Sequence, residues 1–328
     1  MLFNSIPFLI FFSFYISFII LFKNYWKKIT IIFSIFFYGY WNLLFCLLLI
    51  FEGLLIWQIG ELIQKKKLLR KKILIIGITF PLIILFIFKY FNFFVDDILQ
   101  INLESSVLSD IILPIGISFY TFQAIMYLVD IYRFKLSKIN LENFLVFFLF
   151  FPNLIAGPLV RPNSLIPQIN RGIIFNKKNI RTAIILILWG YFLKLCISNN
   201  LNIYVDNVYN HMTEVNSPTL MMGSFFYTFL IYSDFAGYSL ISIGIAKLMG
   251  LNIPANFNNP FFSQNLTEFW RRWHISLSSF LRDYLYIPLG GNRNGLLRTS
   301  LNIFLVMFLG GLWHGASFNF IIWGSLHG

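Results

Sequence analysis

The sequence predicts an all-α fold: a polytopic transmembrane helical bundle that contains short, broken and re-entrant helices. Of the 328 residues, 58% are hydrophobic and only 12% are charged, and the mean hydropathy is +0.74. A soluble domain of this length needs far more charge to cover its surface. The apolar residues also form long runs without the short alternating pattern of a β-barrel. Because lipid offers the backbone no hydrogen bonds, such runs are expected to cross the bilayer as helices.

Five apolar runs with few or no charges are candidate membrane segments. A bilayer core of about 30 Å needs roughly 20 residues of helix. The first run has no Lys or Arg before it and no small-residue cleavage site after it, so it is expected to be a retained span rather than a signal peptide. The chain is expected to form a single membrane domain over residues 1–328. The five runs cover residues 6–22, 31–57, 73–94, 180–197 and 301–313.

The basic residues predict the topology. The formal charge of +12 comes from Lys and Arg in short loops, which is the pattern of a multi-pass protein of the cell inner (plasma) membrane and argues against a nucleic-acid partner. Residues 23–28 and 65–72 are both basic and both favour the inside, and two inside loops cannot flank a single span. The segment 29–63 between them would be about 52 Å long as one helix, which is too long for one crossing. We therefore expect two short helices that enter and return, with a break at "YGYWN", residues 38–42.

The later segments extend this topology. Two prolines and a glycine interrupt the apolar residues 147–162, which predicts a re-entrant or broken helix enclosed by protein. Both cysteines lie in apolar runs without disulfide or zinc-ligand spacing, so no metal site is expected. The remaining expectations are an outward crossing at 73–94, a return at 111–129, a second outward crossing at 180–197, a loop without Lys or Arg at 199–216, and a return at 219–249.

Residues 265–288 are expected to form an amphipathic helix on the cytoplasmic side. Asn265 and Glu268 have the spacing of a capping box, and Pro288 precedes two glycines that end the helix, which places it at about 266–286. Arginines above and below its histidine fit either an interfacial lipid anchor or a mouth that attracts an anionic donor. The polar face carries Thr267, Arg271, His274, Ser278 and Arg282.

A second histidine lies inside an apolar run, in "FLGGLWHGASFN" at residues 308–319. An ionisable side chain in a membrane segment is costly and faces a bundle interior or a cavity, which makes His314 a functional candidate. Its small neighbours leave room for a helix or a substrate to come close. A neutral imidazole can accept a proton near neutral pH, although a hydrogen-bonded core histidine is the alternative.

Five segments in order resemble the membrane-bound O-acyltransferase family, in particular its bacterial alginate O-acetyltransferase-like branch. The resemblance spans essentially the whole chain and rests on several motifs together. They are "LPIGISFYTFQAIMYLVDIYR" (113–133), "FFPNLIAGPLVRP" (150–162), "YSDFAGYSLISIGIAKLMGLNIPANFNNPF" (232–261), "NLTEFWRRWHISLSSFLRDYLYIPLGGNR" (265–293) and "GLWHGASFNFIIWGSLHG" (311–328).

The resemblance implies an acyltransferase whose helices surround a tunnel. It would pass an acyl group, most simply acetyl, from a cytoplasmic thioester such as acetyl-CoA to a hydroxyl of a cell-surface polysaccharide such as alginate or peptidoglycan, with no bound cofactor. By position in the motifs, His314 and His274 match the catalytic pair, and a separate periplasmic or extracellular acyltransferase is the implied partner. Charge placement suggests Arg271, Arg272 and Arg282 as donor contacts; the tunnel-lining or motif positions are Trp313, Gly315, Asn292 and Arg293.

One departure and three alternatives accompany this interpretation. The chain stops about 14 residues after His314, whereas family members continue through further helices, so a C-terminal truncation is expected. His327 is treated as structural. The alternatives are D-alanyl transfer to teichoic acid, a non-enzymatic membrane transporter, for which no internal repeat was found, and a scaffold in which His314 is replaceable.

Overall fold

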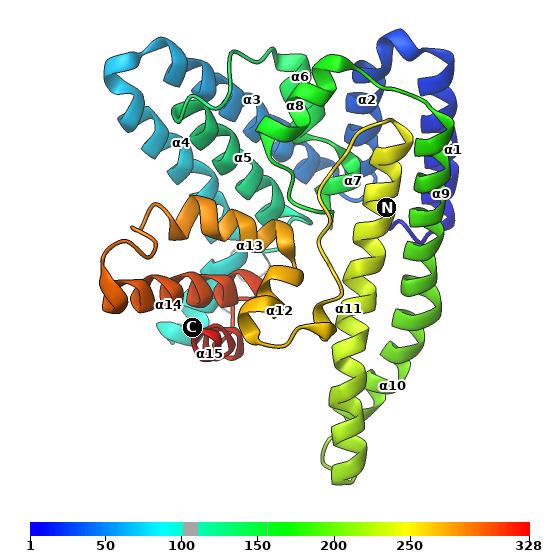
Figure 1. The fold of residues 1–328 in the computed structure, drawn as a ribbon, viewed down its shortest axis with the longest axis vertical. Helices are drawn as coiled ribbons and strands as arrows, with labels where there is room; N and C mark the ends of the chain where they lie inside the picture. Colours follow the sequence, from blue (N-terminus) through cyan, green and yellow to red (C-terminus); the bar gives the residue numbers. More distant parts are fainter. Residues whose placement is uncertain (101–110, 156) are drawn as a thin grey trace.

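The computed structural model describes residues 1–100, 111–155 and 157–328, and the regular structure within these ranges is helical throughout. Figure 1 shows a group of helices on one side and a long hairpin on the other, with the C-terminal helices packed across the lower part of the first group. The predicted all-α polytopic fold is confirmed. Among the described residues, five helices can cross a membrane by length and composition, or six if one bent pair counts as a span.

The chain begins with a sharply bent pair of helices. Helix α1 (Ile6–Leu21) is followed by a single 3-10 turn and by α2 (Trp26–Gly39), and the two axes differ by 110°. The span predicted at 6–22 is therefore not long enough to cross by itself, because 16 helical residues reach only about 24 Å, and it can count as a span only together with α2. The predicted break at 38–42 is confirmed, but α3 (Leu43–Lys65) has 23 residues and is itself long enough to span.

Helix α4 carries the next predicted span. It runs from Arg70 to Leu85 and continues as a π-helical segment, η3 (Phe86–Tyr90), so that Lys67–Tyr90 can cross a membrane. A second π segment, η4 (Phe93–Ile98), follows. The predicted return at 111–129 is shorter than expected, because α5 (Ile117–Tyr132) has 16 residues, most of them buried.

The interrupted helix predicted at 147–162 is confirmed. Helix α6 (Leu141–Phe148), the one-turn α7 (Phe151–Leu154) and α8 (Pro162–Arg171) replace a continuous span. Phe151 is fully buried, with its ring against Tyr15 (5.0 Å) and Phe37 (5.4 Å) of the first two helices. The non-helical backbone is thus enclosed by protein, as a membrane environment requires.

A long hairpin forms the other side of the molecule. Helix α9 (Lys177–Tyr191), the π segment η5 (Phe192–Ser198) and α10 (Asn199–Asn210) form one 34-residue helix, which packs against α11 (Ser217–Leu248). The predicted loop at 199–216 is therefore largely helical, and Figure 1 shows the hairpin tip extending beyond the rest of the chain. Gly190 and Gly237 let the backbones approach, since a Cβ on either glycine would lie within 3.0 Å of the other's carbonyl oxygen.

The last third of the chain contains four further helices. They are α12 (Leu266–Arg272), α13 (Ile275–Leu281) with its π extension η7 (Arg282–Tyr286), α14 (Gly295–His314) and α15 (Phe318–His327). The single helix predicted at 266–286 is wrong, because the chain breaks between α12 and α13. Figure 1 shows α14 lying across the direction of α9 and α11, so the candidate spans are not a parallel bundle.

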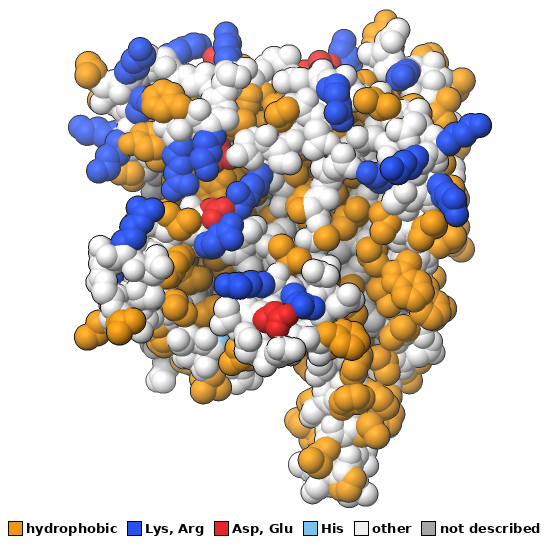
Figure 2. Space-filling model, viewed as in Figure 1, with side chains coloured by type: hydrophobic (Ala, Val, Ile, Leu, Met, Phe, Trp, Pro, Cys, Tyr) orange, Lys and Arg blue, Asp and Glu red, His pale blue; other side chains and the backbone are white. Residues whose placement is uncertain are grey.

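Charge is distributed unevenly along the molecule. Figure 2 shows Lys and Arg gathered at the upper end, where Figure 1 places the α1–α2 and α3–α4 corners, and none on the tip of the α10–α11 hairpin. Apolar side chains are exposed along the hairpin, including Leu188 and Phe225. An apolar flank with one basic end is the surface expected of a multi-pass membrane protein.

Candidate active site

The site is built around the end of α14. His314 is the last residue of this helix, and Gly315 continues in extended backbone. The His314 ring contacts Trp313 (centroids 4.8 Å apart), Trp323 (5.0 Å) and Phe320 (6.1 Å), the last two from α15. The side chain is exposed rather than packed in the core, which argues against the core-histidine alternative.

His314 lines two separate pockets. The first, here called the arginine pocket, has a volume of about 440 Å³, within the range of about 300–1,000 Å³ typical of small-molecule sites. Its apolar floor comes from α14, and its rim is polar and aromatic. Besides His314 its walls include Thr267, Trp270, Arg271, Ser278 and Arg282.

The second, here called the lysine pocket, shares only His314 with the lining of the first. It has a volume of about 260 Å³ and is lined by the start of α5 and the end of η3. Gly116 provides the tight approach, since its φ of +75° favours glycine and a Cβ would clash with the Leu154 carbonyl oxygen. Its other walls include Lys89, Ser118, Phe119, Trp313 and His314.

His274 lies at the break between α12 and α13. Its backbone is left-handed (φ +44°), and its Nδ1 accepts a hydrogen bond from the Leu277 N–H (3.3 Å), so the imidazole is the N-cap of α13. The ring is 3% exposed, packs on Phe235 (4.6 Å) and meets the Trp313 ring edge-on (5.7 Å). Because Nδ1 accepts, the proton is on Nε2, which has no hydrogen-bond partner among the described residues.

The surroundings of His274 keep it neutral. Burial lowers the pKa of His274 to about 3, and the nearby His314 adds to this effect. A buried network fixes the backbone on either side: Asn256 O accepts from Ile275 N–H (2.9 Å), and the Ser276 hydroxyl donates to Asn256 Oδ1 (2.6 Å). His274 thus supports α13 and the Trp313 ring, and it is not a wall of either pocket.

The three predicted donor arginines are in different environments. Arg271 is exposed and lines the arginine pocket, as does Arg282. Arg272 instead pairs with Glu268 at 2.5 Å within α12, away from the pocket wall. The predicted cap of this helix is confirmed, because Asn265 Oδ1 accepts from Glu268 N–H (2.8 Å) and Glu268 accepts in return from the N–H of Gln264 (2.9 Å).

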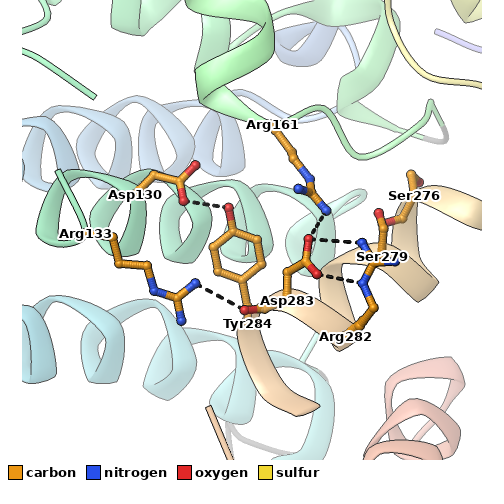
Figure 3. Close-up of polar contacts among 8 residues, drawn as sticks. All are labelled: Asp130, Arg133, Arg161, Ser276, Ser279, Arg282, Asp283 and Tyr284. Carbon is orange, nitrogen blue, oxygen red and sulfur yellow. Dashed lines mark hydrogen bonds and ion pairs between the residues drawn. The ribbon is translucent and has the colours of Figure 1, made fainter. Parts of the chain in front are cut away.

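A polar cluster that the sequence did not indicate anchors one wall of the arginine pocket. Figure 3 shows Asp283 of η7 between Arg161, which precedes α8, and Arg282. Beside it, the Tyr284 hydroxyl donates to Asp130 Oδ1 of α5 (2.9 Å), and Arg133 donates to the Asp283 carbonyl oxygen (3.2 Å). These contacts hold η7 against α5.

Asp283 is the central charge of that cluster. Partial burial opposes its ionisation, but hydrogen bonds and charge from Arg282 and Arg161 outweigh burial and hold the pKa of Asp283 below its ordinary value. Burial and the Asp130 carboxylate raise the pKa of Tyr284, so the phenol remains a hydrogen-bond donor. The cluster therefore keeps the Arg282 guanidinium at the pocket rim in a fixed orientation.

The remaining predicted site residues are distributed as follows. Trp313 lines the lysine pocket, and Gly315 lies against the Phe320 ring, where a side chain would clash. Asn292 and Arg293 are exposed in the turn between η7 and α14 and line neither pocket. Among the described residues no group of three or more His, Cys, Asp or Glu side chains could hold a metal ion.

Several site residues were missed by the sequence reasoning. Lys89 lines the lysine pocket, and the isolated charge in the apolar run 73–94 was a usable signal for it. Trp270 and Trp323 line the arginine pocket, and the ring of His327 packs on both, at 5.3 and 4.7 Å. No local pattern distinguishes these tryptophans from other aromatic residues of a membrane protein.

Comparison with known proteins identifies the family of the chain. The model of the membrane-bound O-acyltransferase family, MBOAT, matches residues 18–328. The chain belongs to this family. Among curated relatives, the "Probable alginate O-acetylase AlgI" of Pseudomonas putida is 40% identical over 319 residues, which cover 93% of this chain and 64% of the relative. The chain therefore spans less than two thirds of the length of that relative.

Two further relatives carry different names. The peptidoglycan O-acetyltransferase of Helicobacter pylori is 35% identical over 337 aligned residues, covering 94% of this chain and 63% of the relative. The teichoic acid D-alanyltransferase of Bacillus subtilis is 29% identical over 225 residues, covering 65% of this chain and 56% of the relative. The two O-acetyltransferase relatives thus align over more of the chain than the D-alanyltransferase does.

Proposed function

We propose that this protein is an O-acetyltransferase of the cell inner (plasma) membrane. It passes an acetyl group from a thioester donor on the cytoplasmic side across the membrane, through an acceptor hydroxyl, for O-acetylation of a cell-surface polysaccharide such as alginate or peptidoglycan. The observation that carries the proposal is that one imidazole, His314, lines both the arginine pocket and the lysine pocket. A donor in the first pocket and a hydroxyl in the second would meet at this side chain.

The chemistry follows from that position. His314 accepts the proton of the attacking hydroxyl, and the hydroxyl oxygen forms a bond to the thioester carbonyl carbon. The carbon–sulfur bond then breaks, and the leaving thiolate takes the proton from the imidazolium. The products are an O-acetyl ester and a free thiol, so atoms and charge balance without a cofactor.

The donor is proposed to bind in the arginine pocket. Arg271 and Arg282 on its rim suit the phosphates of acetyl-CoA or of another acyl thioester, and the apolar floor along α14 suits the acyl and pantetheine portion. His274 supports the site through the Trp313 ring (5.7 Å) rather than by contact with the donor. Its neutral imidazole keeps that interface free of charge.

The lysine pocket is proposed to face the acceptor side. Helix α4 leaves the basic corner at residues 65–72, and Lys89 lies about 28 Å further along the helix. That length is close to the thickness of the hydrocarbon core. A separate periplasmic or extracellular acyltransferase would deliver the group to the polymer, because the 260 Å³ pocket is too small for a polysaccharide.

D-alanyl transfer to teichoic acid is the alternative with a specific observation behind it. A D-alanyltransferase is among the relatives, at 29% identity. The same two pockets would serve that reaction, and a mass analysis of surface polymers separates the two activities. A transporter would need no reactive group between the pockets, so a requirement for His314 in ester formation argues against it.

The test is a disrupted gene complemented with wild type, His314→Ala or His211→Ala. We expect His314→Ala to lower the O-acetyl content of surface polysaccharide at least a hundredfold, since general base catalysis contributes about 10²–10⁴-fold. His211, an exposed histidine at the end of α10, is the matched control and should leave acetylation unchanged. Unchanged acetylation in His314→Ala, at equal membrane abundance, contradicts the proposal.

A further inference from the structure

The carbonyl end of α14 is held by side chains from another helix. The last four carbonyl groups of an α-helix have no partner within the helix, and in α14 these precede the break at Gly315. The Lys89 ammonium donates to the Trp313 carbonyl oxygen, and the Tyr90 hydroxyl donates to the Leu312 carbonyl oxygen (3.0 Å). Two adjacent residues of η3 thus satisfy two adjacent carbonyls immediately before His314.

The chemistry of Lys89 suits this position. A cation at the C-terminal end of a helix is stabilised by the negative end of the helix dipole. The ammonium also lies 5.6 Å from the centroid of the Trp313 ring, a cation–π distance, and 3.5 Å from Ser118 Oγ. Within the described ranges no carboxylate lies within 4 Å of Lys89 to form an ion pair. Its strongest polar contact is therefore the end of α14.

The local backbone supports the same interpretation. Phe86–Tyr90 is a π-helical segment, and such segments are rare and frequent at functional sites. An ionisable group within a membrane span is costly unless it has a partner or faces a cavity. Lys89 meets both conditions, because it reaches α14 and also lines the lysine pocket beside His314.

We propose that Lys89 is a positioning residue for His314. Its ammonium caps α14 through the Trp313 carbonyl and so fixes where the helix ends and where the imidazole stands between the two pockets. Tyr90 assists through the preceding carbonyl. The inference rests on the proposed function for its kinetic consequence, but the fixed orientation of the imidazole is a property of the fold.

The kinetic test compares four variants of the whole protein, expressed from its gene and assayed in native membranes with labelled acetyl-CoA. Lys89→Met keeps the side-chain length without the charge, and we expect kcat to fall ten- to a hundredfold while KM for acetyl-CoA changes less than twofold. Lys89→Arg, which retains a cation, should keep at least a third of kcat, and Tyr90→Phe should lose two- to fivefold. Tyr191→Phe is the matched control, because it removes a hydroxyl that donates to the Phe3 carbonyl oxygen (2.7 Å).

Two results separate positioning from a merely structural role. In the double variant Lys89→Met/His314→Ala, positioning through His314 predicts no loss beyond that of His314→Ala, because residues that act as a unit are not additive. An additive loss overturns the proposal. So does a Lys89→Met protein whose abundance and thermal midpoint fall while kcat per folded molecule is unchanged.

A readout independent of acyl transfer keeps this inference distinct from the proposed function. The rate at which diethyl pyrocarbonate modifies His314, measured by peptide mass spectrometry, reports the environment of the imidazole directly. We expect Lys89→Met to change this rate at least threefold and Lys89→Arg to stay within twofold of wild type. If His314→Ala still transfers acetyl groups, the proposed function fails, whereas equal modification rates in wild type and Lys89→Met overturn the positioning role.

Discussion

Replacing His274 by asparagine separates the helix-capping role of this residue from the effect of its buried imidazole. Asparagine tolerates the left-handed backbone observed there (φ +44°) and is a preferred N-cap, so its side chain can accept from Leu277 N–H as Nδ1 does. The backbone break between α12 and α13 should therefore persist. The substitution removes the titratable ring that lies between Phe235 and Trp313.

The pKa of His274 determines how much the free energy of unfolding of wild type changes with pH. Burial lowers the pKa of His274 to about 3, whereas an unfolded histidine has a pKa of about 6.5. Because the folded value is the lower one, the unfolded state binds more protons between these values, and stability present above pH 6.5 is lost as the pH falls toward 3. At pH 4.5 the folded imidazole is still neutral and the unfolded one is protonated, so wild type loses about 3 kcal/mol through this residue relative to pH 7.5.

The difference in stability between the variant and wild type should change sign between pH 7.5 and pH 4.5. At pH 7.5 the smaller side chain leaves a partly filled space and lowers the free energy of unfolding by about 1–2 kcal/mol. At pH 4.5 the variant avoids this loss of about 3 kcal/mol and should exceed wild type by about 1 kcal/mol. Denaturant unfolding in detergent micelles at the two pH values measures both differences.

The control is another cap without a titratable group. Asn216 caps α11 by accepting from Thr219 N–H (3.0 Å), so Asn216→Ala should cost about 1 kcal/mol at both pH values. If His274→Asn likewise differs from wild type by the same amount at pH 7.5 and pH 4.5, the His274 imidazole is not held neutral by burial, and the reasoning is refuted.

Two further predictions concern the polar cluster and the topology. Asp283→Asn removes the ion pairs with Arg161 and Arg282 and should lower the free energy of unfolding by about 1–3 kcal/mol at neutral pH. The difference from wild type should shrink as the pH falls below the ordinary pKa of an aspartate. Equal stability of the two proteins at neutral pH, measured by unfolding in detergent, would contradict this. In a Cys196→Ser background, a membrane-impermeant maleimide should label a cysteine introduced at Lys66 from the cytoplasmic side and one introduced at Asn210 from the opposite side. Labelling of both cysteines from the same side, or of the Lys66 position from outside, would refute the assignment of the basic corner as cytoplasmic.

The long helices were predictable because their signal is local. The apolar run within Lys67–Tyr90 and the one within Ser217–Leu248 each reach the length needed to cross a bilayer, and no other segment has to be known to recognise them. The break at residues 147–162 was predictable for the same reason, since proline removes a helix hydrogen bond wherever it occurs.

The break at His274 was not predictable, because its cause is remote in the sequence. Residues 266–286 have a suitable cap and a helical period, but the segment 256–258 takes over their backbone hydrogen bonds: Asn258 N–H donates to Arg272 O (3.0 Å), and Ile275 N–H donates to Asn256 O (2.9 Å). These two bonds end one helix and begin the next. Tertiary pairing of this kind overrides local propensity.

The loop predicted at residues 199–216 was wrong because the local composition indicated a loop where tertiary packing forms a helix. Asn199, Asn200, Asn202 and Asp206 give the residues after 198 the composition of a loop, yet α10 continues the helix beyond η5. Its apolar residues Val205 and Val208 are buried, and Val208 lies against the bare backbone of Gly223 in α11. Packing on a partner helix thus stabilises a segment whose polarity indicates a loop.

Three irregular stretches of backbone meet at the candidate site: the π segment η3, the end of α14 and the turn at His274. Side chains of the first and third contact the second. The π segment at Phe86–Tyr90 brings Lys89 and Tyr90 to carbonyls that the end of α14 leaves unpaired, and the left-handed turn at His274 places a neutral ring against Trp313 on another side of that helix end. Irregular backbone is costly in a membrane protein unless surrounding protein satisfies it, and strain of this kind is concentrated at functional sites. Because each stretch depends on the others, a substitution in η3 or at the α12–α13 break should alter the environment of His314 without touching it, and the modification rate of that histidine can detect this before any substrate is known.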